Sequence, residues 1–265
     1  PYHLGILGAS FVEGVQKYVM ACAKHFAGNS IEESRFFVNV VMDERTLREI
    51  YLPHFKACVD AGVASLMSAY NDLNGYLCAH NKHLLTDILK NDWGFKGFVV
   101  SDWEQAVEDT VAAANAGLDV EMPRGEHFNA PALKKAIQEG KVSEKSIDEA
   151  VIRVLRMKLS FITPKFFAGY DKARVGGKEH ASIALEVAHK GAVLLKNEKS
   201  ALPLERGKIK TLAVIGKLSD TKNIGDHGSS DVSPPYVITP LQGIKNKAGD
   251  QIKVLYESCL LYTSD

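Results

Sequence analysis

The sequence predicts a parallel α/β fold in two parts. Short apolar runs alternate with amphipathic helical stretches, and this alternation is typical of parallel sheets whose crossover helices cover both faces or surround a barrel. The chain has 265 residues, 46% of them hydrophobic, which is enough for a sizeable core and longer than the commonest single domain. We therefore expect parts of two domains.

The first part is expected to hold four strands and two well-marked helices. The strands are the apolar runs 21–26, 64–70, 98–102 and 118–122. Asp43 can cap a helix that Pro53 kinks or restarts and Gly62 ends. Ser146 and Glu149 form a capping box ahead of the second helix. The apolar residues of that helix share one face at helical spacing: Val151, Val154, Leu155, Leu159 and Ile162.

The pattern lapses after residue 163, where prolines and glycines interrupt it and neither period persists. We predict a first domain at 1–163, a linker at 164–178 and a second domain at 179–265. The second domain is expected to open with a helix at 179–197. It then holds two strands, at 212–215 and 252–256, and a polar loop at 223–235. Two strands are too few for an independent core, so this domain is expected to be partial.

Charge and hydropathy exclude several classes of partner. Lysine plus arginine equals aspartate plus glutamate, 32 each, so nothing directs the chain toward nucleic acid or an anionic membrane. No apolar run approaches the ~20 residues that a membrane-spanning helix requires. We expect a neutral small-molecule ligand. The chain opens at Pro1 without an initiator methionine or a signal peptide, so we expect it to start within a longer protein.

Polar and aromatic residues stand where three of the predicted strands end. Lys24 and His25 end the first, Tyr70 the second, and Asp102 and Trp103 the third. In (β/α) barrels catalytic groups gather at the carboxyl ends of strands. A carboxylate beside a large ring suits enzymes that break sugar–sugar bonds, because the carboxylate attacks while the ring lies against the sugar. Taken singly, each residue also fits a structural role, such as an N-cap or a packed ring.

The sequence predicts no metal site and no cofactor. Cys78, His80 and His83 resemble a metal cluster by count, but these ligands are crowded and no second pair stands nearby. The run at 214–216 lacks the glycine fingerprint of a dinucleotide fold. The run at 228–230 lacks the glycine spacing of a nucleophile elbow.

A series of short blocks follows a fixed order along nearly the whole chain. The blocks are Lys24-His25-Phe26, Arg35, the helix signature at 43–53, Met67-Ser68-Ala69-Tyr70-Asn71, Asn74-Gly75, Trp93-Gly94-Phe95, Val100-Ser101-Asp102-Trp103, Ala116-Gly117-Leu118-Asp119, and the runs 193–197, 202–204 and 214–216. Together they resemble glycoside hydrolase family 3. As an ordered series, the match is highly specific.

The resemblance implies the later part of a (β/α) TIM-like barrel followed by the beginning of an αβα sandwich domain. It implies a retaining, exo-acting β-glycosidase that needs no cofactor, most similar to β-glucosidases, acting on a small oligosaccharide or β-glucoside. Asp102 would be the nucleophile, and a second carboxylate, roughly 5 Å away in retaining enzymes, would act as acid and base. The sugar would be held by Lys24, His25, Arg35 and Tyr70, with Met67 and Trp103 as apolar walls.

Parts of the family's pattern are absent. An aspartate and an arginine that bind the same sugar lie upstream of residue 1 in the family, and the acid/base glutamate lies after residue 265. Neither Glu198 nor Glu257 is therefore given that role, and we expect the chain alone to turn over poorly. A β-N-acetylglucosaminidase is disfavoured because residues 27–31 contain no histidine. Many β-xylosidases have cysteine in place of Trp103. The alternative from another class is a non-catalytic sugar-binding protein.

Overall fold

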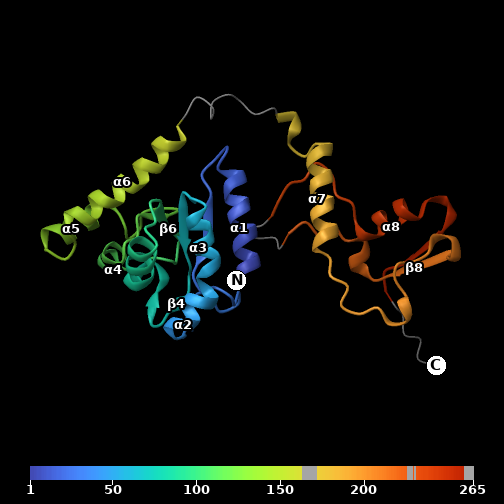
Figure 1. Ribbon diagram of the computed structural model, residues 1–265, viewed down its shortest axis with the longest axis horizontal. Helices are drawn as coiled ribbons and strands as arrows, with labels where there is room; N and C mark the ends of the chain where they lie inside the picture. Colours follow the sequence, from blue (N-terminus) through green and yellow to red (C-terminus); the bar gives the residue numbers. More distant parts are fainter. Residues whose placement is uncertain (163–171, 226–228, 230, 260–265) are drawn as a thin grey trace. The chain divides into compact units, whose positions relative to one another are not determined.

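The computed structural model describes residues 1–162, 172–225, 229 and 231–259 (Figure 1). The chain forms two compact units, Pro1–Gly169 and Tyr170–Asp265. Each unit is described separately below. The predicted linker at 164–178 lies partly outside the described residues, and its boundaries stay predictions.

The first unit is built on a parallel four-stranded sheet of order β1-β3-β6-β7. Its strands are β1 (Cys22–Phe26), β3 (Ser65–Ser68), β6 (Phe98–Trp103) and β7 (Val120–Met122). All four predicted strands are therefore present, and the parallel α/β class is confirmed. Strand β3 ends two residues before Tyr70, so Tyr70 lies in the segment after the strand rather than at its last position.

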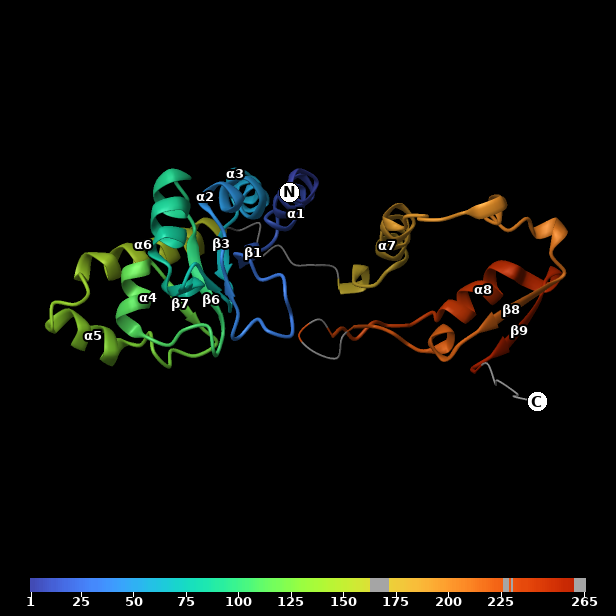
Figure 2. The same cartoon turned by 90° about the horizontal axis from the view of Figure 1, so that it is seen from below.

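The register of the sheet places the carboxyl ends of its strands along one edge. Met67 of β3 pairs with Val100 of β6, and Val100 pairs in turn with Val120 of β7. Figure 2 shows the strands running side by side. Since parallel strands share a direction, the residues that end β1, β3 and β6 meet at the same edge.

Helices flank this sheet and bury its core. They are α1 (Tyr2–Val15), α2 (Glu44–Thr46), the π-helix η1 (Leu47–Tyr51), α3 (Pro53–Asp60), the 3₁₀-helix η2 (Cys78–His80), the π-helix η3 (His83–Asp92), α4 (Thr110–Ala116), α5 (Ala130–Gln138) and α6 (Glu144–Phe161). Fully buried side chains from both layers meet, among them Leu66 and Val99 from the sheet and Leu84 and Ile88 from η3. Phe26 packs edge-to-face on Phe55 at a centroid distance of 5.1 Å.

Local signals set several helix boundaries as expected. The Asp43 side chain accepts the Thr46 N–H at 2.6 Å, so it caps α2. Pro53 restarts the helix as the first residue of α3. A small sheet of β2 (Asn39–Val40), β4 (Asp72–Leu73) and β5 (Tyr76–Leu77) lies in the same unit.

One expectation for α6 is wrong. The helix begins at Glu144 with Ser143 at the N-cap position, so Ser146 lies inside the first turn and forms no cap. Val142 is buried against Ala136, and the helix begins directly after this contact, about one turn earlier than expected. The apolar residues that were expected to share one face of α6 are largely exposed in this unit, for example Leu155 and Leu159.

The second unit holds α7 (Lys178–Gly191), β8 (Thr211–Ile215), α8 (Pro240–Ala248) and β9 (Lys253–Glu257). Strands β8 and β9 pair in parallel, as expected for an opening α/β unit. The expected helix at 179–197 is shorter, because α7 ends at Gly191 and its C-cap residue Ala192 is extended. No helix in the described part of the chain combines the length and apolarity needed to cross a bilayer.

The close approach of β6 to β3 depends on Gly97. A Cβ at this position would overlap the Ala64 carbonyl, whose oxygen accepts the Phe98 N–H at 3.2 Å. Gly97→Ala is expected to lower the free energy of unfolding by about 3 kcal/mol through overpacking. The measurement is urea unfolding.

Gly14 supplies the matched control, since a Cβ there meets no atom within 4 Å. Gly14→Ala lies in α1 and is expected to raise stability by about 0.5 kcal/mol. Equal losses of stability in the two variants would contradict the role assigned to Gly97.

Candidate active site

Asp102 is the buried carboxylate at the carboxyl end of β6. The residue is 6% exposed. Its Oδ1 accepts the Trp103 N–H at 2.8 Å. Its Oδ2 is buried and has no well-aligned hydrogen-bond partner among the described residues, although Nε2 of His25 lies 3.3 Å away. The backbone therefore holds one carboxylate oxygen, and His25 lies beside the other.

His25 faces Asp102 from β1 as a neutral imidazole at pH 7. Burial lowers the pKa of His25, and the positive charges of Lys24 and Arg35 lower it further, while the Asp102 carboxylate acts in the opposite direction. A neutral ring keeps one N–H donor and one acceptor. His25 can therefore donate a hydrogen bond without placing a second full charge beside Asp102.

Tyr70 reaches the same carboxylate from the segment after β3. Burial raises the pKa of Tyr70 to about 12, with further contributions from the charge of Asp102 and from hydrogen bonding to it. The phenol therefore stays protonated and can donate. Tyr70 therefore places a hydrogen-bond donor beside the Asp102 carboxylate.

Arg35 joins this cluster through two aromatic rings. Its guanidinium carbon lies 4.8 Å from the centroid of Phe36 and 5.1 Å from that of Tyr70. Its Nη1 also forms an ion pair with Glu32 at 2.8 Å. Cation–π contacts of this kind hold the flat guanidinium in place. Sequence reasoning did not identify Phe36, and its only signal was a position next to Arg35.

Of the other predicted site residues, Trp103 contacts the Asp102 carboxylate through its backbone N–H, whereas no ion pair or hydrogen bond joins Lys24 or Met67 to it in the described structure. Lys24 is exposed and acts on His25 through its charge. Met67 is half-buried in β3, paired with Val100. Trp103 is 49% exposed, so its ring is available at the end of β6.

A buried amide supports the loops around the site. Asn71 donates through Nδ2 to the Ala27 carbonyl at 3.2 Å and to the Asp72 carbonyl at 3.0 Å. These bonds connect the segment that follows β3 to the one that follows β1. Asn71 belongs to the block that contains Tyr70, but its supporting role was not predicted.

A second set of charged residues anchors the opposite end of β6. The side chain of Asp119 is fully buried. Its Oδ2 accepts the Val99 N–H at 2.7 Å, and it forms ion pairs with Lys90 at 3.2 Å and Arg153 at 2.9 Å. Burial lowers the pKa of Lys90 to about 8, against the charge of Asp119. This cluster connects η3, β6, β7 and α6.

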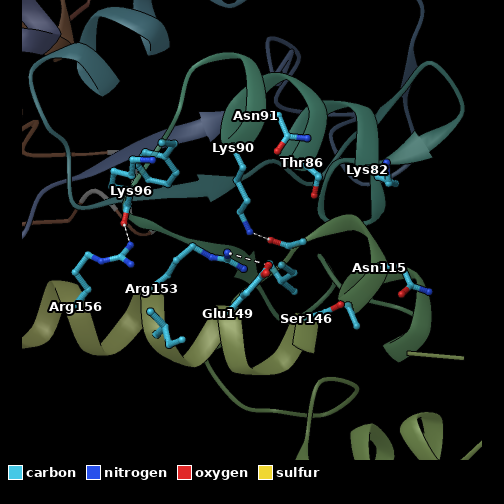
Figure 3. A pocket seen from close by; sticks show the side chains of 15 residues that line it. Lys82, Thr86, Lys90, Asn91, Lys96, Asn115, Ser146, Glu149, Arg153 and Arg156 are labelled. Atoms are coloured by element: carbon cyan, nitrogen blue, oxygen red, sulfur yellow. Dashed lines mark hydrogen bonds and ion pairs between the residues drawn. The ribbon is translucent and has the colours of Figure 1, made fainter. Parts of the chain in front are cut away.

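A cavity of about 580 Å³ lies beside this cluster and not beside Asp102. Figure 3 shows Lys90 and Arg153 reaching into it from η3 and α6. It is an ion-pair pocket at the amino end of β6. No group of three histidine, cysteine or acidic residues suited to a metal ion occurs within the described ranges.

Comparisons with known proteins agree with this geometry. Residues 1–157 match the glycosyl hydrolase family 3 N terminal domain, and residues 192–258 match the C-terminal domain of the same family. The chain belongs to glycoside hydrolase family 3. The expected resemblance is confirmed, as is the fold of a partial barrel followed by part of the second domain.

Family 3 relatives include enzymes with different names. The chain is 40% identical to thermostable beta-glucosidase B of Acetivibrio thermocellus, over 97% of this chain and 33% of that protein. It is 35% identical to a beta-xylosidase of Formosa agariphila, over 97% of this chain and 40% of that protein. A crystal structure of beta-glucosidase from Kluyveromyces marxianus in complex with glucose aligns with a TM-score of 0.83 at 31% identity, covering 94% of this chain and 31% of that one.

The chain spans about a third of the length of the first curated relatives. Membership of glycoside hydrolase family 3 is thus supported by both sequence and fold.

Acidification is expected to destabilise the first unit through His25. In the unfolded chain the His25 imidazole is protonated near pH 6.5, whereas the pKa of His25 in the folded protein is lower. The unfolded state therefore binds more protons below pH 6.5, and stability falls as the pH falls. Urea unfolding between pH 7.5 and 5 measures this slope, which His25→Gln should reduce.

His54 and His80 also have lowered pKa values because they are buried, so part of the slope should remain in His25→Gln. His180 is exposed on α7, and His180→Gln is the matched control. An unchanged slope in His25→Gln would contradict the assignment.

Asp119→Asn is expected to lower the free energy of unfolding by about 3 kcal/mol, because it leaves Lys90 and Arg153 buried without their carboxylate. Asp148→Asn changes an exposed carboxylate on α6 and should change stability by less than about 0.5 kcal/mol. Thermal unfolding compares the two. Similar melting temperatures for the two variants would show that the buried cluster contributes little to stability.

Proposed function

We propose that the protein carrying this chain is a retaining, exo-acting β-glucosidase that releases terminal β-D-glucose through a covalent intermediate on Asp102. One observation carries the proposal: a buried carboxylate at the end of a barrel strand has one oxygen without an aligned hydrogen bond. His25 and Tyr70 lie beside it, and Arg35 packs against the Tyr70 ring. Membership of the family gives this arrangement its chemical context.

In the proposed first step, Oδ2 of Asp102 attacks the anomeric carbon of the terminal glucose. The new C–O bond forms as the glycosidic C–O bond breaks, and the departing oxygen takes a proton from the acid/base residue. Because Oδ1 accepts the Trp103 N–H, the carboxylate is oriented before the sugar arrives. In the second step water displaces the sugar from Asp102, with the same acid/base residue acting as base.

The acid/base residue is proposed to come from sequence outside these 265 residues. Retaining enzymes hold the two carboxyl groups roughly 5 Å apart, and no glutamate of this chain is assigned to that role. The relatives, about three times as long as this chain, leave ample sequence to supply it. The proposed division remains a barrel part at 1–163, a linker at 164–178 and a sandwich part at 179–265.

We assign the sugar-binding roles by position around Asp102. His25, Arg35 and Tyr70 would donate to hydroxyl groups of the bound glucose, and Lys24 would add a donor from the same strand end. Trp103 would lie against the sugar with its exposed ring, and Met67 would supply the opposite apolar wall. No cofactor is required by this chemistry.

The main rival is β-xylosidase activity, which one relative at 35% identity carries in its name. Trp103 favours glucose, since many xylosidases of the family have cysteine there. Hydrolysis of 4-nitrophenyl β-glucoside, β-xyloside and N-acetyl-β-glucosaminide by the full-length gene product separates the candidates. A preference for either of the last two would refute the glucosidase assignment.

A mechanism-based probe tests the nucleophile. A 2-deoxy-2-fluoro-β-glucoside with a dinitrophenolate leaving group needs no acid catalyst for departure, and its slow turnover leaves the sugar on the nucleophile. Incubation of the full-length gene product should add one fluoroglucosyl group, which peptide mass spectrometry should locate at Asp102. Asp102→Ala should abolish the label and retain the melting temperature.

Asp148→Ala, an exposed carboxylate on α6, is the matched control and should label normally. A label on another residue would overturn the assignment of Asp102. Absence of any label from an active wild-type protein would rule out the covalent mechanism.

A further inference from the structure

Two adjacent phenylalanines are exposed in the segment that connects β1 to β2. Phe36 is 41% exposed and Phe37 is 85% exposed. Moving a large aromatic ring out of water is favourable, so a ring as exposed as Phe37 can contribute to the binding of a ligand. The question is whether the loop itself requires these rings.

The backbone of this segment is held without Phe37's ring. The N–H groups of Phe37 and Val38 both donate to the Ser34 carbonyl at 2.9 Å, which closes the turn. Asn39 accepts the Gly75 N–H through its side chain at 2.8 Å, which fixes the end of the segment. The ring of Phe37 is therefore available to a ligand.

The rings continue outward from Asp102 in a series of contacts. Tyr70 interacts with the Asp102 carboxylate. The Phe36 ring lies 4.7 Å from the Tyr70 ring, and the Phe37 ring lies 6.3 Å from that of Phe36. Both separations are within the range of favourable aromatic pairs. The two phenylalanines thus extend an aromatic surface from the residue that would receive the sugar to the solvent.

The charge at this surface is already balanced. Arg35 lies against Phe36 and Tyr70 and is paired with Glu32, so the rings do not present an unpaired cation to a ligand. A neutral, planar, apolar group matches these faces best, because it stacks on them and displaces water without burying a charge.

We propose that Phe36 and Phe37 form the binding surface for the aglycone and that the preferred substrates are β-glucosides of planar aromatic alcohols. The inference rests on the proposed glucosidase function and specifies its substrate class. In it, Phe36 also keeps Arg35 and Tyr70 in place, whereas Phe37 packs on Phe36 and otherwise serves the aglycone. Phe37 is therefore the informative residue to change.

Two inhibitors that are not hydrolysed separate aglycone binding from chemistry. Phenyl and methyl 1-thio-β-D-glucosides share the sugar and differ in the aglycone, and their competitive inhibition constants are measured against 4-nitrophenyl β-glucoside hydrolysis by the full-length gene product. Phe37→Ala is expected to weaken the phenyl compound by about fivefold, the worth of one aromatic contact, and to change the methyl compound by less than about twofold. Phe37→Trp should retain the wild-type preference.

Phe11 provides a matched control, since it is 71% exposed on α1, outside the segment after β1. Phe11→Ala should leave the ratio of the two inhibition constants unchanged. The proposal is overturned if Phe37→Ala leaves that ratio unchanged, if it weakens both inhibitors equally, or if Phe11→Ala shifts the ratio as much. The proposal would also be overturned if the wild-type protein hydrolysed a disaccharide such as cellobiose as efficiently as aryl glucosides, or more efficiently.

The glucosidase function and the aglycone assignment are refuted by different results. If the wild-type protein hydrolyses aryl β-glucosides but Phe37→Ala leaves the inhibitor ratio intact, only the aglycone assignment fails. If the wild-type protein, folded by its cooperative melting transition, hydrolyses no β-glucoside, the glucosidase function fails and the aglycone assignment fails with it.

Discussion

The parallel pairing of β1, β3 and β6 is the constraint on which the candidate site depends. The polar groups of the site come from strands that are far apart in the sequence, yet Nε2 of His25 and Oδ2 of Asp102 lie 3.3 Å apart. Parallel strands make this possible because their carboxyl ends share an edge. The pairing depends in turn on Gly97, because a side chain at this position would overlap the Ala64 carbonyl. It also depends on Asp119, whose carboxylate accepts the N–H of Val99 near the start of β6.

Within that frame, the site balances burial against charge. Asp102 is buried, and an imidazole with a lowered pKa and a phenol with a raised pKa lie beside its carboxylate. A protonated His25 would form an ion pair with the Asp102 oxygen that is proposed as the nucleophile. The lowered pKa of His25 and the raised pKa of Tyr70 therefore give one arrangement, in which two uncharged donors face the carboxylate.

Much of this could be predicted from sequence, and the exceptions have physical causes. Strand positions were predictable because buried parallel strands are continuous apolar runs, and Asp43 was predictable as a cap because its contact is local. The start of α6 was not, because a tertiary contact of Val142 decided it. Asp119 matched a family block, but its contacts with Lys90 and Arg153 join segments far apart in the chain. Phe36 lacked any periodic signal, since its partners are reached only through the folded loop.

The anchoring of Val99 by Asp119 has a consequence for how inactive variants should be interpreted. Two residues lie between Val99 and Asp102 on one strand, and a shift of about 1 Å at a catalytic group can cost two orders of magnitude in rate. With Asp102 as the proposed nucleophile, a genetic screen for loss of function should therefore also recover substitutions at the amino end of β6, away from Asp102. Such alleles would mark where the strand is held, rather than where the bond is broken.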